Sequence, residues 1–380
     1  GLGLFYQPFQ TAQTKLLKAE NCLIKGAHFN MKKYIVILIS LLIGLIGLII
    51  LYQQVGIKDI FSQLSKLQSW QFLIIFATSL FIMILTTERW KLIVEDFAQI
   101  KPSWSTIIKA RLGELAISYL TPIMYFGGEG VRAYILNKDK EIPISVGLST
   151  VLIDRISEFI GAFIFIFFGA IFLLMEKSFI WGLFLFILAF IIFLFLYLVI
   201  ELIGLDRGLL FIVKIFRLDK VKYKSKNVGE TTIGERLVSL AGQVGAYLQR
   251  SRFKFYLIVI LSCLSLIVWL WQTKLLINFL GFNLPWGKIF IIKIILALSG
   301  FIPIPADLGA YEGAHVLAFN IFGLPAEAAI ALSIVTRAFD LLWVSIGIFL
   351  ISHLVVELMA NLLKIFKIEN NKSSDESSTN

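Results

Sequence analysis

Two groups of charged residues lie inside long apolar stretches, where a charged side chain usually has a function. The first group is Asp154, Arg155 and Glu158, and the second is Arg337 and Asp340. A charge near the centre of a bilayer costs roughly 2.5–3.5 kcal/mol on insertion scales. Arginine suits phosphate recognition, because its planar guanidinium binds two oxygens at once and stays charged when partly desolvated. These residues therefore indicate a site for an anionic phosphate group.

A purely structural role for the two arginines is the alternative. Each arginine has an acid three residues later, on the same face of a helix, where it can neutralise the charge locally. Arg155 is followed by Glu158, and Arg337 is followed by Asp340. Under this alternative the ion pairs only lock neighbouring helices together.

Each arginine follows a segment rich in proline and glycine, and the two segments match. Pro122 lies 33 residues before Arg155, and Pro303 lies 34 residues before Arg337. The segments also share glycines, a Glu-Gly pair and an acid after the arginine, all at one offset of about 182 residues. This agreement indicates an internal repeat.

The prolines and glycines predict two helices that break inside the membrane. Proline removes a backbone donor and disfavours helix in the residue before it, and glycine permits a tight turn. In the first repeat, helices Thr106–Leu120 and about Glu129–Leu136 flank the break. In the second, Ile289–Ser299 and a helix that ends near Phe322 flank it. Such re-entrant hairpins need protein or a wet cavity around them. The predicted break residues are Pro122, Gly127, Gly128, Gly130, Pro303, Pro305, Gly309 and Gly313.

Basic side chains near the two breaks are the candidate substrate ligands. Arg111 and Lys293 occupy corresponding places, ten or eleven residues before the proline. The predicted substrate-binding residues are Arg111, Arg132, Arg155, Lys293 and Arg337, and inverted symmetry would bring Arg111, Arg155, Lys293 and Arg337 toward one cavity.

Acids beside these residues are predicted to neutralise them or to couple transport to ions. The set is Glu129, Asp154, Glu158, Asp307, Glu312 and Asp340. An acid at a helix start also offsets the helix dipole, so a structural role for Glu129, Asp307 and Glu312 stays open. The histidines and cysteines show no metal-ligand spacing, and no catalytic residue, metal or cofactor is predicted.

The composition is that of a polytopic helical membrane protein. The chain is 58% hydrophobic and 16% charged, whereas soluble domains are only about 45–50% apolar. Several apolar runs reach the roughly 20 residues that a spanning helix needs. We therefore predict an all-α bundle of six full spans plus two re-entrant hairpins in an inverted repeat. The predicted spans are Tyr34–Tyr52, Trp70–Thr87, Ser145–Leu174, Phe179–Ile203, Phe255–Phe279 and Ala328–Ser352.

The chain divides into three parts. Residues 1–30 have no clear period and precede Met31-Lys32-Lys33, so we interpret them as an extension from a misplaced start, with an interfacial arm as the alternative. Residues 31–352 form the transmembrane domain, with repeat units at about 105–174 and 287–352 and a basic segment at 204–254. Within the basic segment, an amphipathic helix is predicted from its apolar residues Ile233, Leu237, Leu240, Val244 and Leu248. Residues 353–380 form a polar tail, and 370–380 are predicted to be disordered.

The loop charges predict the orientation in the membrane. Glu88-Arg89-Trp90-Lys91 is typical of a membrane–water boundary, and cytoplasmic loops are rich in Lys and Arg. The segment 204–254 carries eleven Lys/Arg against four Asp/Glu. This pattern places that segment and both termini on the cytoplasmic side of the cell (inner) membrane. The net charge of +10 then meets anionic lipid headgroups, not nucleic acid.

The segment Pro122–Tyr134 resembles part of a known membrane family. Its pattern Pro…Gly-Gly-x-Gly-x-x-Arg-Ala-Tyr is similar to the transmembrane domain of lysylphosphatidylglycerol synthases and their stand-alone flippase-like relatives. The run from Pro303 to Arg337 resembles the same domain, although Ala306-Asp307-Leu308 stands where that family is richer in Ser and Gly. The resemblance covers Met31 to about Ser352.

The resemblance implies a lipid translocase for a phospholipid or a polyprenyl-phosphate-linked lipid. In the full-length synthases a soluble C-terminal domain transfers the aminoacyl group, and only 28 residues follow Ser352 here, so we expect no such enzyme activity. The alternatives are a membrane component of aminoacyl-phospholipid synthesis and an ion or small-solute carrier. The expected partners are lipids with an anionic headgroup or a lipid-linked phosphate, and a glycosyltransferase or lipid-modifying enzyme.

Overall fold

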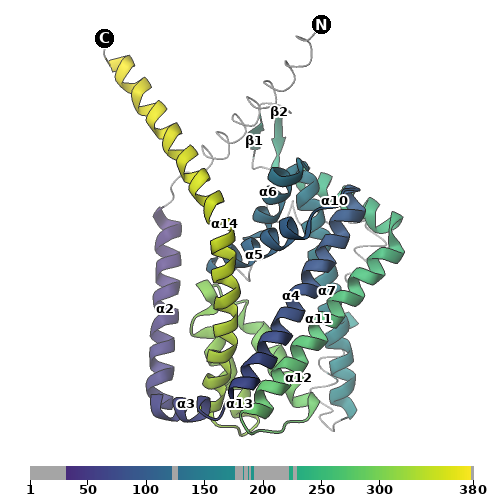
Figure 1. Cartoon of the computed structure of the whole chain (residues 1–380), viewed down its shortest axis with the longest axis vertical. Coiled ribbons are helices and arrows are strands. Elements are labelled where there is room, and N and C mark those ends of the chain that lie inside the picture. The colour runs from purple at the N-terminus through teal and green to yellow at the C-terminus, as the bar shows by residue number, and fades with distance from the viewer. Residues whose placement is uncertain are drawn as a thin grey trace.

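A computed structural model describes residues 31–121, 127–175, 183, 187, 190–191, 222–225 and 229–377. These residues form a bundle of helices with a small two-stranded hairpin at one end (Figure 1). In chain order the helices are α2 (Met31–Val55), α3 (Ile57–Leu64), α4 (Ser69–Ala98), α5 (Trp104–Leu120), α6 (Glu129–Lys140), α7 (Ile144–Met175), α10 (Ile233–Arg250), α11 (Arg252–Phe279), α12 (Trp286–Ser299), the 3₁₀ turn η3 (Pro305–Asp307), α13 (Ala310–Ile321) and α14 (Ala326–Ser377).

Three of these helices are long and apolar enough to cross a membrane by themselves. They are α4, α11 and the part Ala326–Ser352 of α14. In the most apolar 18-residue stretch of each helix, only 17% to 28% is buried inside the protein. Most of each stretch therefore faces outward, as lipid-facing helices require. α2 passes the same test only together with α3, from which it is bent by 81°. The predicted span Phe179–Ile203 lies outside the described residues except at positions 183, 187, 190 and 191, so the count of six spans stays a prediction.

Two predicted helix ends are wrong. α4 continues to Ala98, so Arg89 and Trp90 lie within the helix and are buried inside the protein, 1% and 0% exposed. Burial is possible because acids of α7 neutralise Arg89. α14 continues to Ser377, so the predicted disorder of 370–380 is wrong for residues 370–377. The sequence after Gly347 has no proline or glycine to stop the helix.

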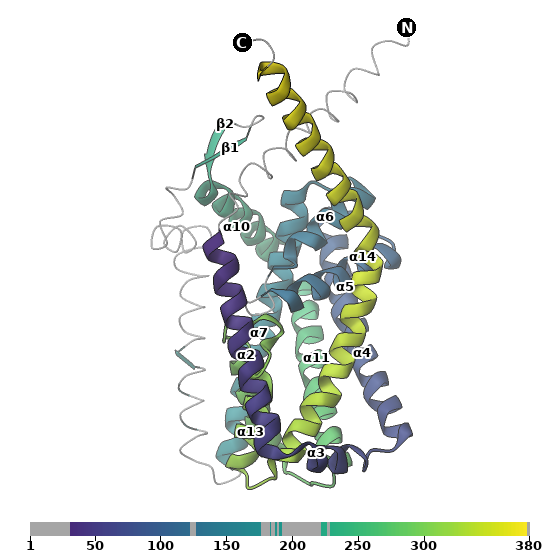
Figure 2. The ribbon, with the colours of Figure 1, turned by 90° about the vertical axis from the view of Figure 1, so that its left-hand side faces the viewer.

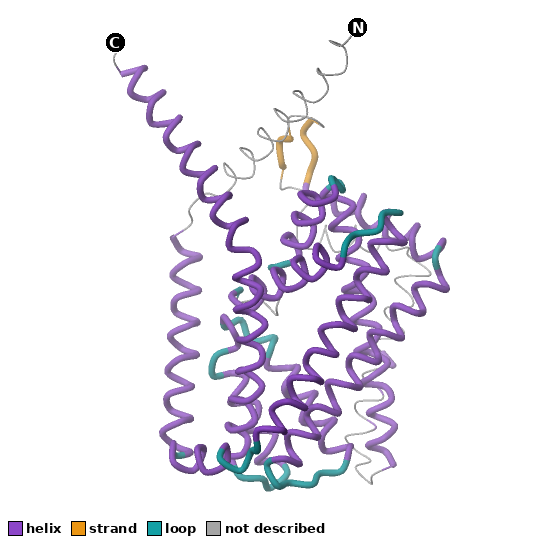
Figure 3. The backbone as a smooth tube through the Cα atoms, in the orientation of Figure 1, coloured by secondary structure: helices purple, strands orange, loops and turns teal. Residues whose placement is uncertain are grey.

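Both predicted helix breaks are present. α5 ends at Leu120 and α6 begins at Glu129, while α12 ends at Ser299 and α13 begins at Ala310. Residues 122–126, including Pro122, lie outside the described part of the chain. Figure 1 shows α5 and α6 in the upper half of the bundle and α12 and α13 in the lower half. Figure 3 shows loop where the short helices are interrupted.

The second break is built against α2, which packs beside α13 and η3 (Figure 2). Gly309 has a φ of 75°, which favours glycine. A Cβ added to Gly309 would lie 2.5 Å from the carbonyl oxygen of Gly44, and one added to Gly44 would lie 2.6 Å from that of Leu308. The two backbones therefore touch because neither glycine has a side chain.

Each hairpin is held by its own apolar core. Around the first, Trp90, Ile107 and Leu136 are fully buried between α4, α5 and α6. Around the second, Phe319 and Ala328 are fully buried in a larger cluster of α11, α12, α13 and α14. Charged residues beside the breaks are thus positioned by packed helices.

The basic segment 204–254 contains the predicted amphipathic helix, which is confirmed, and a β-hairpin that the sequence did not predict. The predicted amphipathic helix is α10, whose residues Ala241, Val244 and Tyr247 are buried against the bundle. Before it, β1 (Lys222–Ser225) pairs antiparallel with β2 (Gly229–Thr232). The fold is therefore helical as predicted, apart from this one small hairpin among the described residues. Adjacent threonines in β2 favour an extended backbone.

Gly128→Ala should destabilise the protein, whereas Gly130→Ala should not. A Cβ at Gly128 would lie 2.2 Å from the carbonyl oxygen of Glu114 and 2.6 Å from Ser118 Oγ, but one at Gly130 would meet nothing within 4 Å. Overpacking of this kind costs about 1–3 kcal/mol, and Ala is favoured over Gly in an open helical position. Thermal unfolding in detergent measures both variants. Equal midpoints would show that α5 and α6 do not pack this closely.

Candidate functional site

A cluster of eight charged side chains lies between the first hairpin and the long helices. We call it the arginine–carboxylate cluster; it consists of Arg89 of α4, Arg111 and Glu114 of α5, Glu129 and Arg132 of α6, and Asp154, Arg155 and Glu158 of α7. Four arginines face four carboxylates, so the formal charges cancel. Asp154 is ten residues from the start of α7, which is about 15 Å along the helix. The cluster is therefore well inside the bundle.

The inner layer of the cluster is fully buried. Asp154, which is 0% exposed, accepts hydrogen bonds from Arg89 Nε and Arg132 Nη1, both at 2.7 Å. Arg132 also donates to Glu114, and its guanidinium lies 4.8 Å from the ring centre of Trp90. Guanidinium groups suit such a place because they pair with two acids and stack on an aromatic face at once. Arg132, a predicted substrate ligand, thus has no surface open to a substrate here.

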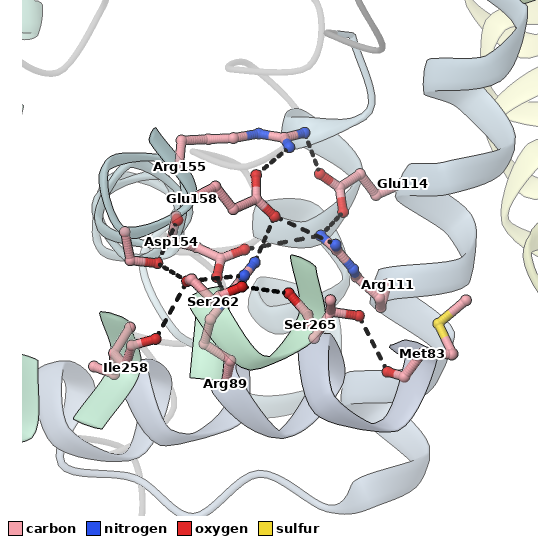
Figure 4. A network of polar contacts seen from close by, with 12 residues as sticks. Met83, Arg89, Arg111, Glu114, Asp154, Arg155, Glu158, Ile258, Ser262 and Ser265 are labelled. Carbon is pink, nitrogen blue, oxygen red and sulfur yellow. Dashed lines mark hydrogen bonds and ion pairs between the residues drawn. The ribbon is translucent and has the colours of Figure 1, made fainter. Parts of the chain in front are cut away.

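The outer layer of the cluster is partly exposed. Arg155 donates to Glu114 at 2.8 Å, to Glu129 at 2.9 Å and to Glu158 at 2.7 Å. Arg111 donates to Glu114 at 2.8 Å. The side chains of Arg111, Arg155, Glu129 and Glu158 are 15%, 20%, 21% and 28% exposed. Figure 4 shows Arg155 and Arg111 turned toward Glu114 and Glu158.

These two layers differ in what they can do chemically. A buried carboxylate that holds two guanidinium groups fixes the helices, since removal of either partner leaves an unpaired charge. The outer guanidinium groups are reached by solvent, and another anion can replace their carboxylates. A phosphate is suitable, because it offers several oxygens to the planar fork. The predicted pair Arg155–Glu158 is present, as one contact in a larger network.

Arg337 holds the second break. Its guanidinium donates to the carboxylate of Glu312, to the main-chain oxygens of Ala306 at 2.7 Å and Asp307 at 3.0 Å, and to Tyr119 Oη at 3.1 Å. Ala306 and Asp307 have φ values of 56° and 50°, a left-handed conformation that is costly outside glycine. One arginine therefore stabilises a strained backbone and joins it to α5.

The predicted pair Arg337–Asp340 is wrong. Among the described residues Arg337 forms its ion pair with Glu312, and Asp340 forms none. Spacing on one helix places Asp340 near Arg337, but Glu312 reaches the guanidinium from α13 and also offers two oxygens.

The two breaks share one set of contacts. In the first, Glu129 Oε2 accepts the Gly127 N–H at 2.7 Å; in the second, Glu312 Oε2 accepts the Gly309 N–H at 2.8 Å. Each glutamate also binds the arginine of the long helix that follows its hairpin. These acids therefore stabilise a helix start and neutralise an arginine at the same time, while their coupling of transport to ions stays a prediction.

A cavity of about 340 Å³ lies between the two hairpins. Its polar wall includes the carboxylates of Asp307 and Asp340, the hydroxyls of Tyr119 and Tyr311, and Gln272. In the part of the chain that is described, no Lys or Arg lines it. The four basic residues expected in one cavity are found in two places instead, since Arg111 and Arg155 belong to the cluster while Lys293 and Arg337 lie beside the second break.

Sequence reasoning missed three residues of these networks. The sequence predicts a membrane boundary at Arg89, but an arginine that interrupts a long apolar stretch is also a signal of an intramembrane ion pair. Glu114 lies in a short helix with Arg111 three residues earlier, and this spacing was a usable signal. Tyr119 gave no signal, because only the packing of α5 against α14 brings it to Arg337.

Comparison with known proteins places this architecture in a family. The family described as the lysylphosphatidylglycerol synthase TM region matches residues 37–347, which contain both breaks and the whole cluster. The chain belongs to this family. It is also 25% identical over 311 residues to a UPF0104 membrane protein of Methanocaldococcus jannaschii, which covers 79% of this chain and 89% of that protein. The protein is therefore a multi-pass integral membrane protein, as the composition and the resemblance predicted.

Proposed function

We propose that this protein moves a lipid with an anionic headgroup, either a phospholipid or a polyprenyl-phosphate-linked lipid, between the leaflets of the cell membrane. One observation carries the proposal: Arg111 and Arg155 lie deep in the bundle, yet they are partly exposed beside acids that an anion can displace. The family name, which refers to a phospholipid synthase, agrees with a lipid substrate.

The pairing of charges inside the bundle supports a polar path for the headgroup, with the lipid tails outside the protein. Eight charged groups inside an apolar bundle are costly, and they are kept neutral by mutual pairing. A phosphate that enters the outer layer exchanges one negative partner of Arg155 for another, and the displaced carboxylate of Glu129 or Glu158, 21% and 28% exposed, can be hydrated. The exposed apolar side chains of α4 and α11, such as Phe72, Leu73, Tyr256 and Ile260, leave a surface on which lipid tails stay in the bilayer.

The proposed architecture has six full spans, two hairpins in an inverted repeat, and both termini in the cytoplasm. It is supported by the placement of the two hairpins at opposite ends of the bundle (Figure 1) and by the matching glutamate–arginine contacts at the two breaks. Inverted repeats with broken helices are recurrent in transporters that alternate access to a central site.

A carrier for a small cation is the second candidate function. It is favoured by the carboxylates of Asp307 and Asp340 on the wall of the cavity. A role in aminoacyl-phospholipid synthesis is a further proposal, which the family name supports. A glycosyltransferase or lipid-modifying enzyme is proposed as the protein partner.

Leaflet exchange in reconstituted liposomes tests the proposed function. Purified protein is inserted into vesicles that carry one labelled lipid, and the label exposed at the outer leaflet is measured over time. We expect faster exchange of labelled phosphatidylglycerol or polyprenyl phosphate than of phosphatidylcholine, and no such difference in protein-free vesicles. Folded protein that accelerates no lipid, but takes up a small cation, would favour the second candidate.

A further inference from the structure

Lys293 is a buried amine beside the central cavity. Its side chain belongs to α12 and is 4% exposed, and Nζ lies 3.2 Å from the ring centre of Trp269. Among the described residues it forms no ion pair, although a buried ammonium normally has a carboxylate partner. Leu296 and Ala297, one turn later on the same face of α12, line the cavity together with Trp269. The amine is thus directly behind the cavity wall.

Asp340 is an acid on the wall of the same cavity as Trp269, over whose ring the Lys293 amine lies. It lies on α14, lines the cavity, and is exposed to it. Among the described residues Asp340 also forms no ion pair. A cavity of about 340 Å³ has room for several waters, since each occupies about 30 Å³ in the liquid. Waters in this space can hydrate the Asp340 carboxylate.

The other titratable or charged groups around this pair already have partners. On α14, Arg337 is bound to Glu312 of α13. On α13, His315 Nδ1 is 2.8 Å from the main-chain oxygen of Tyr311, and the Tyr311 hydroxyl is bonded to Thr336. Toward α7, α12 presents Phe290, whose ring contacts Phe165 at 4.7 Å. Asp307 of η3 lines the cavity as well, and α11 contributes the uncharged Trp269.

We infer that Lys293 and Asp340 form a proton-binding pair that couples transport to proton movement. A proton released from Nζ to water turns the ammonium into a neutral amine, and uptake of a proton restores the ammonium beside the Asp340 carboxylate, so one cycle of the pair binds and releases one proton. Lysine can make this change when buried, whereas arginine stays charged. Asp340 is three residues after Arg337, which holds the strained backbone of the second break. A change of charge in the pair therefore occurs one helical turn from the arginine that holds the second break.

A proton fits this site better than a sodium ion. An ammonium beside the carboxylate repels any metal cation, but it can itself donate a proton. The coupling part of this inference rests on the proposed function, because it needs lipid transport to couple to. Proton binding by the pair does not need transport and can be measured alone.

Tryptophan fluorescence measures proton binding without any transport. Because the Lys293 amine lies over the Trp269 ring, a change of its charge alters the emission of that indole. We expect a transition between about pH 5 and pH 10 in purified protein, lost in Lys293→Met and in Trp269→Phe, and moved to lower pH in Asp340→Asn. The matched control is Lys274→Met, because Lys274 lies over Trp286 in the same way, at 4.4 Å, outside the cavity. A transition that persists in Lys293→Met, or is lost in Lys274→Met, would overturn the inference.

Exchange assays under imposed gradients separate this inference from the proposed function. With a gradient of one pH unit across the vesicle, which is about tenfold in proton activity, net movement of the anionic lipid should be changed severalfold in wild type but not in Asp340→Asn. If a sodium gradient drives movement and a pH gradient does not, the proton inference is wrong and the proposed function stands. If no lipid moves but the Trp269 transition follows the pattern above, the proposed function is wrong and the proton-binding pair stands.

Discussion

Asparagine in place of Asp154 should destabilise the protein more than any other single substitution in the arginine–carboxylate cluster. Asp154 is fully buried and accepts a charge-assisted hydrogen bond from each of Arg89 and Arg132. Its loss leaves four arginines facing three acids, with two guanidinium groups short of a partner. Breaking a buried ion pair on one side costs about 3–5 kcal/mol, and here one residue takes part in three pairs, with Arg89, Arg111 and Arg132.

The thermal unfolding midpoint and the yield of monodisperse protein measure this effect. Asp59→Asn is the matched control, because Asp59 is an exposed acid in the first turn of α3 and contributes about 0.3–1 kcal/mol there. We expect Asp154→Asn to unfold at a much lower temperature than the control, or to be lost during purification. Equal midpoints would mean that the inner layer is hydrated and not the rigid support described above.

Glutamine in place of Arg155 should abolish lipid exchange while the protein stays folded. Water can hydrate Glu129 and Glu158, which are 21% and 28% exposed, and the buried Glu114 keeps Arg111 and Arg132 as partners. Arg155→Lys should also impair exchange, since a point charge does not replace the bidentate fork. Lys91→Gln is the matched control, because Lys91 pairs with Glu88 and Glu95 on α4, outside the cluster.

A double-mutant cycle separates this role from a purely structural one. Glu158 keeps Arg89 and Arg111 when Arg155 is removed, but Glu129 has no other ion pair among the described residues. The informative partner is therefore Glu129, with Glu129→Gln as the second substitution. If the arginine only neutralises that acid, the double variant should regain both the unfolding midpoint and lipid exchange. If it binds lipid, the midpoint recovers and exchange does not.

The two breaks could be predicted because proline and glycine act locally. Pro303 and Gly309 restrict or free the backbone at their own positions, so the sequence places the interruption of α12 and α13 without knowledge of the fold. The pair Arg155–Glu158 was predictable for the same reason, since the spacing on one helix brings the side chains together.

Contacts between distant helices were not predictable in this way. Arg337 selects Glu312, which is 25 residues earlier on another helix, over Asp340 on its own. The rotation of α13 and α14 about their axes decides this choice, and it depends on the packing of the whole bundle. The same packing places Asp307 and Asp340 on the cavity wall, where no Lys or Arg of the described residues lies. The positions of the intramembrane charges therefore predicted which helices carry charged side chains, but not which of these side chains pair with each other.

The most direct test of the central claim compares initial rates of leaflet exchange in wild type and Arg155→Gln. Vesicles carry either labelled phosphatidylglycerol or labelled phosphatidylcholine, and Lys91→Gln serves as the control for reconstitution. The account predicts that wild type and the control move the anionic lipid faster than the zwitterionic one, and that Arg155→Gln moves neither above the rate of empty vesicles. Wild-type rates for the anionic lipid in folded Arg155→Gln protein would contradict it.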